Sequence, residues 1–307
     1  MDGYRHLPVL VEEVGQFLAP RPEGIYVDCT VGGGGHARAL LEAGAGVVLG
    51  LDRDPRALAA AGEALASFGD RARLLRADFR DLAAVLAAQG MAQVHGILAD
   101  LGVSSHQIDT AERGFSYIQD GPLDMRMDPQ APVTAADLVN RRSEQELTEI
   151  FRRYGEEPFA RRIARFIVLQ RIAGPVTTTG QLVEIIRAAV PTAGRGHPAK
   201  RVFQALRIAV NQELAALESL LEASPSLLLP GGRIAVISYH SLEDRMVKES
   251  FRRAAAPCRC PPDLPECRCG AQPSLRLLTR RPCVPTGGEQ QVNPRSRGAK
   301  LRAAERL

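Results

Sequence analysis

The 307-residue sequence contains no tryptophan, and aromatic residues make up only 5% of it. It also has no run of about 18 consecutive apolar residues, the length that a membrane-spanning helix needs. Residues 1–14 lack the basic start and the apolar stretch of a secretory signal peptide. Membrane insertion and secretion are therefore not expected, and a soluble, cytoplasmic protein is the default expectation.

The composition is not extreme either. Hydrophobic residues make up 45% and charged residues 24%, which is typical of a globular chain, and the net charge is only +4. The positive charge is nevertheless clustered: Arg152–Arg171 holds six arginines against two acids, and Pro273–Leu307 holds eight basic residues against two acids. Such runs are most often solvated surface, although clustered positive charge also suits a polyphosphate such as RNA.

The first hundred residues alternate between strand and helix patterns. Ile25–Thr30 predicts a buried strand, which is followed by the glycine run Gly32–Gly35 and a helix over 36–43. Val47–Leu51 predicts a second strand, and Asp54 before Pro55 predicts the start of a helix. Further strands are expected over 73–77 and 94–99. This alternation predicts a parallel sheet with helices on both faces.

An acidic residue ends or follows each of these strands: Asp28, Asp52, Asp78 and Asp100. Ligands of such sheets bind beyond the carboxyl ends of the strands, and an acid after the second strand suits a ribose diol. The glycine run lacks the third glycine of a dinucleotide fingerprint and fits the loop of S-adenosylmethionine enzymes better. An adenosine cofactor is therefore expected, with Asp52 on its ribose.

Several long and unusual strings carry a resemblance to a known family. They are His6–Leu10, Gly32–His36, Asp100–Ser105, Arg113–Tyr117, Gly121–Asp128, Gly155–Pro158, His197–Ala199, Phe203–Ile208, Ser238–Arg245, Asn293–Arg295 and Lys300–Arg302. Through them the sequence resembles, almost end to end, the MraW (RsmH) family. Members of that family methylate N4 of a cytidine in the decoding centre of bacterial 16S ribosomal RNA, within the small ribosomal subunit.

The resemblance implies an α/β fold: a class I (Rossmann-like) S-adenosylmethionine-dependent methyltransferase sheet with an inserted all-helical domain. Residues 1–109 and 208–307 would form the discontinuous methyltransferase domain, and 110–207 the inserted substrate-recognition domain. Helical patterns over 143–154, 159–172 and 179–189 agree with this division. Strand patterns resume over 231–237 and end in two expected antiparallel strands near 275–280 and 299–304.

The resemblance also implies a set of cofactor contacts. They fall on Gly34, Gly35, His36, Asp52, Phe79, Asp100 and Gln107. Phe79 suits the face of adenine, with a core position as the alternative. Asp78 would lie near the adenine amino group or cap a helix before Arg80.

Methylating an exocyclic amine requires an acceptor for its proton. Asp100, at the end of the fourth strand, is the first candidate, although anchoring the cofactor would explain it equally well. The string Asp100-Leu-Gly-Val lacks the Pro-Pro-Tyr of DNA amino methyltransferases. His240, after the fifth strand, is the second catalytic candidate, with a structural role as the alternative. Ser241 and Asp244 are expected to cap the next helix, and Tyr239 to stack on the target base or to pack.

Two further segments suit an RNA substrate. The Arg152–Arg171 stretch is a candidate clamp on the phosphate backbone of an RNA whose cytidine is turned out. Asp124, Arg126 and Asp128 lie in a methionine-containing segment that looks too polar for a core. They would shape the cytidine pocket or form a salt-bridged hinge.

The cysteines form a conspicuous pattern near the C-terminus: Cys258, Cys260, Cys267 and Cys269. Disulfides are not expected in the cytosol, so the alternatives are a zinc site and a proline-rich loop with reduced thiols. Zinc ligands more often follow C-x-x-C spacing, and the chemistry proposed needs no metal, so no catalytic metal is expected. Cys29 is interpreted as a core residue rather than a nucleophile.

Three other functions remain open on the sequence alone. They are a non-catalytic assembly factor with a vestigial pocket, a nicotinamide-dependent oxidoreductase, and a methyltransferase acting on DNA or protein. The sequence leaves the oligomeric state undetermined.

Overall fold

A computed structural model describes residues 7–256 except 191–195, residues 258 and 260, and residues 269–307. The chain forms two compact units, Met1–Gly102 with Leu214–Leu307, and Val103–Glu213. The second unit therefore begins before residue 110 and ends after residue 207, the bounds expected from the sequence. In the part of the chain that is described, no helix is both long and apolar enough to cross a bilayer.

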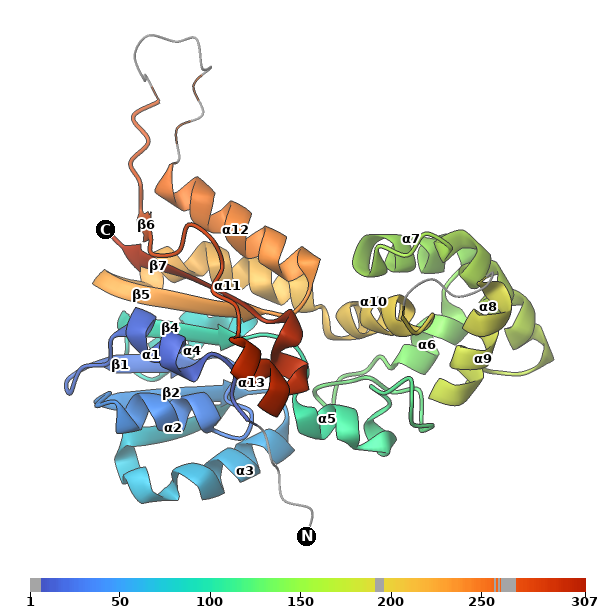
Figure 1. The fold of residues 1–307 in the computed structure, drawn as a ribbon, viewed down its shortest axis with the longest axis horizontal. Helices are drawn as coiled ribbons and strands as arrows, with labels where there is room; N and C mark the ends of the chain where they lie inside the picture. The colour runs from blue at the N-terminus through green and yellow to red at the C-terminus, as the bar shows by residue number, and fades with distance from the viewer. Residues whose placement is uncertain (1–6, 191–195, 257, 259, 261–268) are drawn as a thin grey trace. The chain divides into compact units, whose positions relative to one another are not determined.

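The first unit is built on a seven-stranded sheet of order β3-β2-β1-β4-β5-β7-β6 (Figure 1). Its strands are β1 Ile25–Asp28, β2 Val47–Asp52, β3 Ala72–Arg76, β4 Val94–Asp100, β5 Leu228–Ser238, β6 Leu275–Leu277 and β7 Lys300–Arg306. Strands β1 to β5 are parallel, whereas β7 runs antiparallel to β5 and β6 antiparallel to β7. The predicted parallel sheet and its antiparallel closing strands are confirmed.

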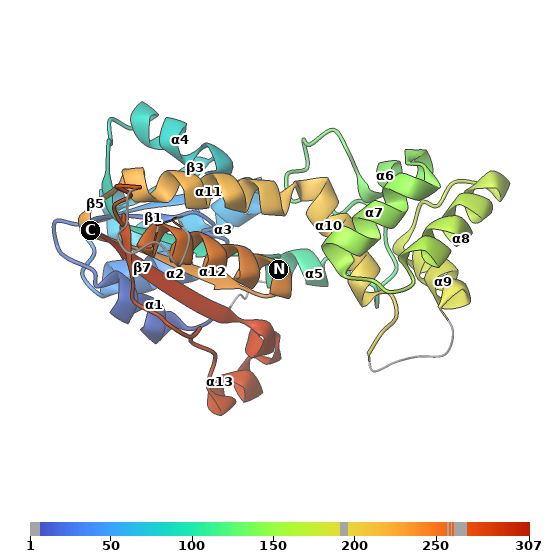
Figure 2. The same ribbon diagram turned by 90° about the horizontal axis from the view of Figure 1, so that it is seen from above.

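Helices cover both faces of this sheet. Side chains of α1 Val11–Leu18, α2 Gly35–Glu42 and α3 Pro55–Leu65 share one apolar cluster with the strands. Those of α4 Leu82–Ala88, α11 Glu213–Leu227 and α12 Ser241–Ala255 share the other. Figure 2 shows α4 and α11 on one side of the strands and α1 on the other. The central strands β1, β2 and β4 are mostly buried, which explains their apolar sequences, whereas the neighbouring strand β3 is only partly buried.

Shorter elements join these layers. They are the 3-10 turns η1 Ala66–Arg71, η2 Phe79–Asp81 and η4 Pro294–Gly298, and the helix α13 Gly287–Val292. The predicted start of α3 is confirmed, because the Asp54 carboxylate accepts a hydrogen bond of 3.0 Å from the backbone N–H of Arg56, with Pro55 in the first turn.

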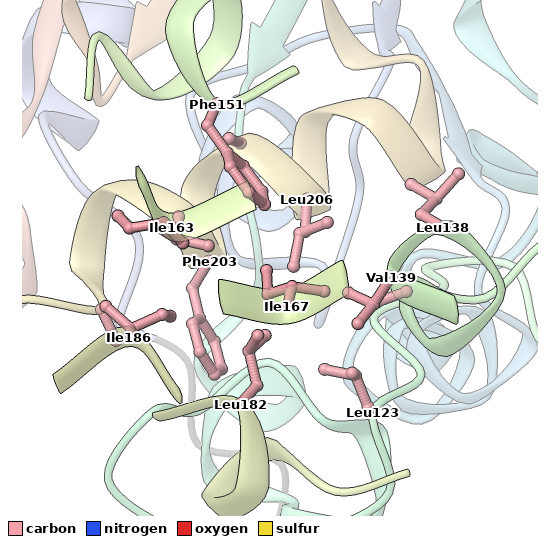
Figure 3. Close-up of a cluster of buried hydrophobic side chains, with 14 of the residues drawn as sticks. Leu123, Leu138, Val139, Phe151, Ile163, Ile167, Leu182, Ile186, Phe203 and Leu206 are labelled. Carbon is pink, nitrogen blue, oxygen red and sulfur yellow. The ribbon is translucent and has the colours of Figure 1, made fainter. Parts of the chain in front are cut away.

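The second unit is helical and has a core of its own (Figure 3). It contains α5 Ser105–Asp109, η3 Ala111–Arg113, α6 Ala135–Arg141, α7 Glu144–Gly155, α8 Ala160–Ala173, α9 Thr179–Ala189 and α10 Lys200–Asn211. Ile163 and Ile167 of α8 are four residues apart, which puts both on one helix face, and both are fully buried. Phe151 from α7 and Leu206 from α10 close the core around them (Figure 3).

The segment before α6 corrects one expectation from the sequence. Met125 and Met127 belong to the helical core, so the segment is not too polar for a core. The neighbouring polar side chains pair with each other: Arg126 donates two hydrogen bonds of 2.7 Å to the carboxylate of Asp124. The Asn211 amide fixes the backbone of both methionines, at 2.7 Å in each case.

A pair of substitutions in α8 tests this core. We expect Ile167→Ala to lower the free energy of unfolding by about 2–5 kcal/mol, because it leaves a cavity among packed side chains. Ile172→Ala removes the same atoms from the same helix at a residue that is 79% exposed, and should cost less than about 0.5 kcal/mol. Urea unfolding followed by circular dichroism measures both. Equal losses would contradict the assignment of the core.

Candidate active site

The site is built where β1 and β4 end side by side. Asp28 of β1 pairs in register with Leu98 of β4, so Asp28 and Asp100 close adjacent strands at the same edge of the sheet. The loop that follows β1 is held against the end of β4, because the backbone N–H of Asp100 donates a 2.7 Å hydrogen bond to the Thr30 hydroxyl. Two acidic side chains are thereby held close together.

Asp100 is fixed by partners that lie far from it in the sequence. The Tyr239 hydroxyl donates a 2.9 Å hydrogen bond to Oδ1 of Asp100. The other oxygen, Oδ2, lies 3.4 Å from Nε2 of His36, a close approach that is not aligned as a hydrogen bond. Burial and the neighbouring Asp100 charge raise the pKa of the Tyr239 hydroxyl far above its usual range, so it stays protonated and donates.

The imidazole of His36 lies beside the Asp100 carboxylate. Burial lowers the pKa of this imidazole, but contact with Asp100 and the charges of Asp100 and Asp28 outweigh burial, and the net shift is upward. Sequence reasoning placed His36 here only through the family resemblance. Thr30 and Tyr239 were missed as partners of Asp100, and no local sequence signal marks either contact.

Asp28 is the most confined acid at this edge. Its side chain is only 1% exposed, and one oxygen accepts a 3.2 Å hydrogen bond from the backbone N–H of Thr30. Burial raises its pKa to about 6, and the charges of Asp100 and Asp52 act in the same direction against that of His36.

Three buried polar atoms at this edge have no hydrogen bond with any described residue: Oδ2 of Asp28 and both ring nitrogens, Nδ1 and Nε2, of His36. Buried polar atoms in native proteins are nearly always satisfied by protein, water or ligand. The chemistry of S-adenosylmethionine fits this edge, since its amino and sulfonium groups are cationic and the edge carries several carboxylates.

Asp52, at the end of β2, organises the glycine loop. One carboxylate oxygen accepts a 3.0 Å hydrogen bond from Gly32 N–H and the other a 2.9 Å bond from Asp54 N–H. Burial raises its pKa. The predicted ribose contact would therefore be made by a carboxylate that the backbone already orients.

The loop glycines have packing reasons of their own. Gly34 has a φ of 85°, and a Cβ there would lie 3.3 Å from Cγ of Leu65. A Cβ on Gly35 would lie 3.0 Å from Cγ of Pro8. A side chain at either position would therefore crowd its neighbours, and at Gly34 it would also have to adopt a left-handed backbone conformation.

Phe79 and Asp78 follow β3. Phe79 is 8% exposed and belongs to the sheet core, which is the alternative that the sequence left open. Asp78 caps η2 by accepting a 2.9 Å hydrogen bond from the backbone N–H of Arg80, which is the second of the two roles that the sequence suggested for it. Neither observation tests a contact with adenine.

Gln107 belongs to the helical unit. Its side chain accepts a 3.1 Å hydrogen bond from Ser104 N–H, and the Ser104 hydroxyl accepts one from Gln107 N–H, so the two form the capping box of α5. Its predicted cofactor contact stays a prediction.

His240 caps α12, and here the structure corrects the expected cap. The capping box is formed by His240 and Glu243, not by Ser241 and Asp244. Nδ1 of His240 accepts from Glu243 N–H at 3.4 Å, while Oε2 of Glu243 accepts from Tyr239 N–H at 2.9 Å. Histidine is not a usual N-cap residue, so the wrong pair was chosen.

Asp244 instead ties α12 to the last strand. Its carboxylate accepts a 2.6 Å hydrogen bond from Arg302, and Lys300 lies 3.4 Å away. The turn that carries Tyr239 is therefore fixed through Glu243, and the helix that follows it is fixed to β7.

The cysteines divide into two groups. Cys29 is buried in the sheet core as predicted, and burial raises the pKa of its thiol, so it is not a nucleophile at neutral pH. The thiols of Cys258, Cys260 and Cys269 lie together. Cys267, the fourth residue of the predicted cluster, is outside the described residues.

A Rossmann-like sheet of this strand order, with acids at the ends of β1, β2 and β4, defines a class I methyltransferase. The sequence matches the MraW methylase family over residues 3–307, and the chain belongs to that family. The resemblance drawn from the sequence strings is confirmed, and S-adenosylmethionine is the cofactor. Membership of a methylase family contradicts the oxidoreductase alternative.

Close relatives span the whole chain. A protein of Heliobacterium modesticaldum is 56% identical over 310 residues, with 99% of each chain covered. A protein of Geobacter sulfurreducens is 56% identical over 309 residues, with the same coverage. Both are named ribosomal RNA small subunit methyltransferase H. Among solved structures, an rRNA methylase of Streptococcus thermophilus aligns with a TM-score of 0.42 and 13% identity over 99% of each chain.

Asp28→Asn tests the electrostatics of this edge. Folding raises the pKa of Asp28 to about 6. The protonated carboxyl therefore stabilises the fold at low pH, and this contribution is lost as the pH rises through about 6. Asparagine keeps the Thr30 contact without ionising, so the variant should gain up to roughly 3 kcal/mol over the wild type between about pH 4 and pH 7. Urea unfolding of both proteins across that range measures the difference. Parallel stability profiles would contradict a raised Asp28 pKa.

Proposed function

We propose that the protein transfers a methyl group from S-adenosylmethionine to N4 of a cytidine in the decoding centre of 16S ribosomal RNA, within the small ribosomal subunit. The names of its relatives support an RNA of the small subunit as substrate, and the string resemblance supports the N4 position. The proposal places the enzyme in the bacterial cytoplasm, where ribosomal subunits are assembled. The single observation that carries the chemistry is the Asp100 carboxylate, 9% exposed and held by Tyr239 at the end of β4.

Asp100 is the proposed proton acceptor. When bound, S-adenosylmethionine would supply an electrophilic methyl group, and breaking its sulfur–methyl bond would leave S-adenosylhomocysteine. The cytosine amine has a delocalised lone pair, so it must lose a proton as the bond from nitrogen to the methyl carbon forms. Oδ1 of Asp100 is occupied by the Tyr239 hydroxyl, which leaves Oδ2, near His36, to take that proton.

Tyr239 supplies the tyrosine that the Asp100-Leu-Gly-Val string lacks. The DNA amino methyltransferase motif carries its tyrosine on the same loop as its acid. Here the residue after β5 brings a tyrosine hydroxyl to the acid at the end of β4. We therefore assign Tyr239 to positioning Asp100 rather than to stacking on the base.

His240 is proposed as a positioning residue. Its Nδ1 accepts from the backbone of α12 and its Nε2 lies 3.1 Å from Glu243, so the imidazole is committed to the turn that carries Tyr239. The alternative of His240 as a second proton acceptor would require this cap to open.

Different residues of the site are proposed to bind different parts of S-adenosylmethionine. Asp52 accepts from the ribose hydroxyls, and the loop containing Gly34 and Gly35 lies along the methionine portion. Asp28 and His36 offer their unsatisfied atoms to its polar end. Phe79 and Gln107 enter this set through the family resemblance.

A groove on the helical unit suits the RNA. It encloses about 710 Å³ and is lined by Glu144, Arg152, Pro158, Phe159, Arg161, Arg162, Arg165, Phe166 and Leu169. Four arginines and one acid make it strongly positive, which suits backbone phosphates. The guanidinium of Arg162 lies 5.6 Å from the ring centre of Phe166, and Phe159 is 38% exposed, so stacking surface for a base is present as well.

Methyl transfer to ribosomal particles tests the function. Small subunits from cells lacking this protein are incubated with purified enzyme and methyl-labelled S-adenosylmethionine, and the labelled nucleoside is identified by mass spectrometry. Label in N4-methylcytidine at one decoding-centre position supports the proposal. Cofactor binding without label on subunits or on deproteinised RNA would instead support an assembly factor. Label on DNA or protein would show that the substrate is not ribosomal RNA.

Tyr239→Phe tests the positioning role. Loss of one hydrogen bond to a buried charged group costs about 1.5–3 kcal/mol, so kcat should fall about ten- to a hundredfold. Affinity for S-adenosylmethionine, measured by calorimetry, should stay unchanged, because the lost bond orients the proton acceptor. A weakened cofactor affinity with unchanged kcat would assign Tyr239 to binding instead.

Arginines of the groove are expected to contact phosphates. The double change Arg161→Gln with Arg165→Gln should weaken RNA binding and reduce the slope of log affinity against log salt by about one for each arginine that neutralises a phosphate. The control Arg142→Gln with Arg187→Gln removes the same charge from arginines paired with Glu146 and Glu184. Fluorescence anisotropy at several salt concentrations compares the two. Equal slopes would show that the groove does not hold the backbone.

A further inference from the structure

Three thiols converge in the segment between α12 and β6. The sulfur atoms of Cys258, Cys260 and Cys269 all lie within 4.8 Å of one another. Cys258 and Cys269 are exposed and Cys260 is half-buried, so packing does not account for their meeting. We propose that Cys258, Cys260 and Cys269 bind a zinc ion in a structural site.

The spacing of the sulfurs fits this metal. A zinc–thiolate bond of about 2.3 Å in tetrahedral geometry places neighbouring sulfurs about 3.8 Å apart. Sulfurs within 4.8 Å therefore need to close by at most about 1 Å on loading. Thiolates are also the ligands for which zinc and other soft cations have the highest preference.

The segment is already closed at its base. Helix α12 packs beside β6 (Figure 1), and the backbone N–H of Ser274 donates a 2.9 Å hydrogen bond to the carbonyl oxygen of Ala254. The three thiols lie on the chain beyond this bond, two after α12 and one before β6. A metal bound there cross-links the two arms of the connection.

The proposed zinc site differs in chemistry from the methyl-transfer site. Its ligands are soft thiolates, whereas the residues grouped around Asp100 are carboxylates, an imidazole and a phenol. The three described thiols would fill three of the four positions of a tetrahedral zinc site, and the sequence holds a further thiol, Cys267, outside the described residues. Zinc binding releases protons from the thiols and adds its binding free energy to the stability of the connection.

Metal content of the full chain tests the proposal. The protein, purified without a histidine tag from zinc-supplemented cells, should contain about one zinc ion per chain by plasma mass spectrometry. Replacement by cobalt should give the near-ultraviolet absorption of a cobalt–thiolate bond. Cys258→Ser with Cys269→Ser should lower the zinc content to background.

Cys283→Ser is the matched control. Cys283 is half-buried and pairs through its backbone with Leu301 of β7, away from the zinc ligands in the sequence. It should leave zinc content and cobalt absorption unchanged. Circular dichroism and calorimetric binding of S-adenosylmethionine show whether each variant is folded.

Alkylation of the wild type gives a second readout that needs no variant. Bound zinc should protect Cys258, Cys260 and Cys269 from iodoacetamide, and a chelator should expose them, as read by peptide mass spectrometry. Zinc at background level in the wild type, or zinc retained in the double variant, would overturn the proposal. A disulfide among the three cysteines in protein purified under reducing, anaerobic conditions would overturn it as well.

Discussion

The carboxylates of Asp28 and Asp100, at the ends of adjacent strands, determine the electrostatics of the active edge. The parallel register of β1 and β4 brings Asp28 and Asp100 to one place, with the imidazole of His36 beside Asp100. Burial, together with the charge of Asp100, raises the pKa of Asp28 to about 6. Burial lowers the pKa of His36, but the contact with Asp100 and the two carboxylate charges outweigh it, and the net shift is upward. Cationic groups of a bound cofactor would relieve the repulsion between the two carboxylates, which is the physical reason for expecting S-adenosylmethionine at this edge.

The loop between β1 and α2 satisfies that constraint. Thr30 accepts from the backbone of Asp100, and Asp52 accepts from that of Gly32, so the loop is pinned to two other strands. Asp100 receives its own support from the turn after β5, where His240 and Glu243 fix the backbone that carries Tyr239. Each site residue thus depends on a strand end that the sheet topology places beside it.

Local signals made much of the fold predictable. Apolar runs, the glycine loop and the Asp54–Pro55 start of α3 indicated a parallel sheet, because strands buried on both faces and helix caps leave a mark within a few residues. The buried positions of Met125 and Met127 were not predicted, because the charged residues beside them hid the alternation of apolar and polar residues in this segment. The contact that fixes the backbone of both methionines comes from the Asn211 amide, on a helix far along the chain.

The candidate site was predictable only in part. Asp28, Asp52 and Asp100 stood out as acids at strand ends, whereas the contact of Tyr239 with Asp100 joins residues 139 positions apart. The cap of α12 was misassigned because histidine, not serine, accepts from the helix. The packing of Gly34 and Gly35 against Leu65 and Pro8 likewise depends on tertiary neighbours that no local pattern reveals.

The central claim is that Asp100 receives the proton of the cytidine amine. A crystal structure of the chain with S-adenosylhomocysteine and an RNA hairpin carrying the target cytidine tests it most directly. Proton transfer to Asp100 predicts N4 within about 2.6–3.2 Å of Oδ2 of Asp100, with the ribose hydroxyls of the cofactor on Asp52. A base whose N4 faces another acceptor, with Asp100 bound only to the cofactor, would contradict it.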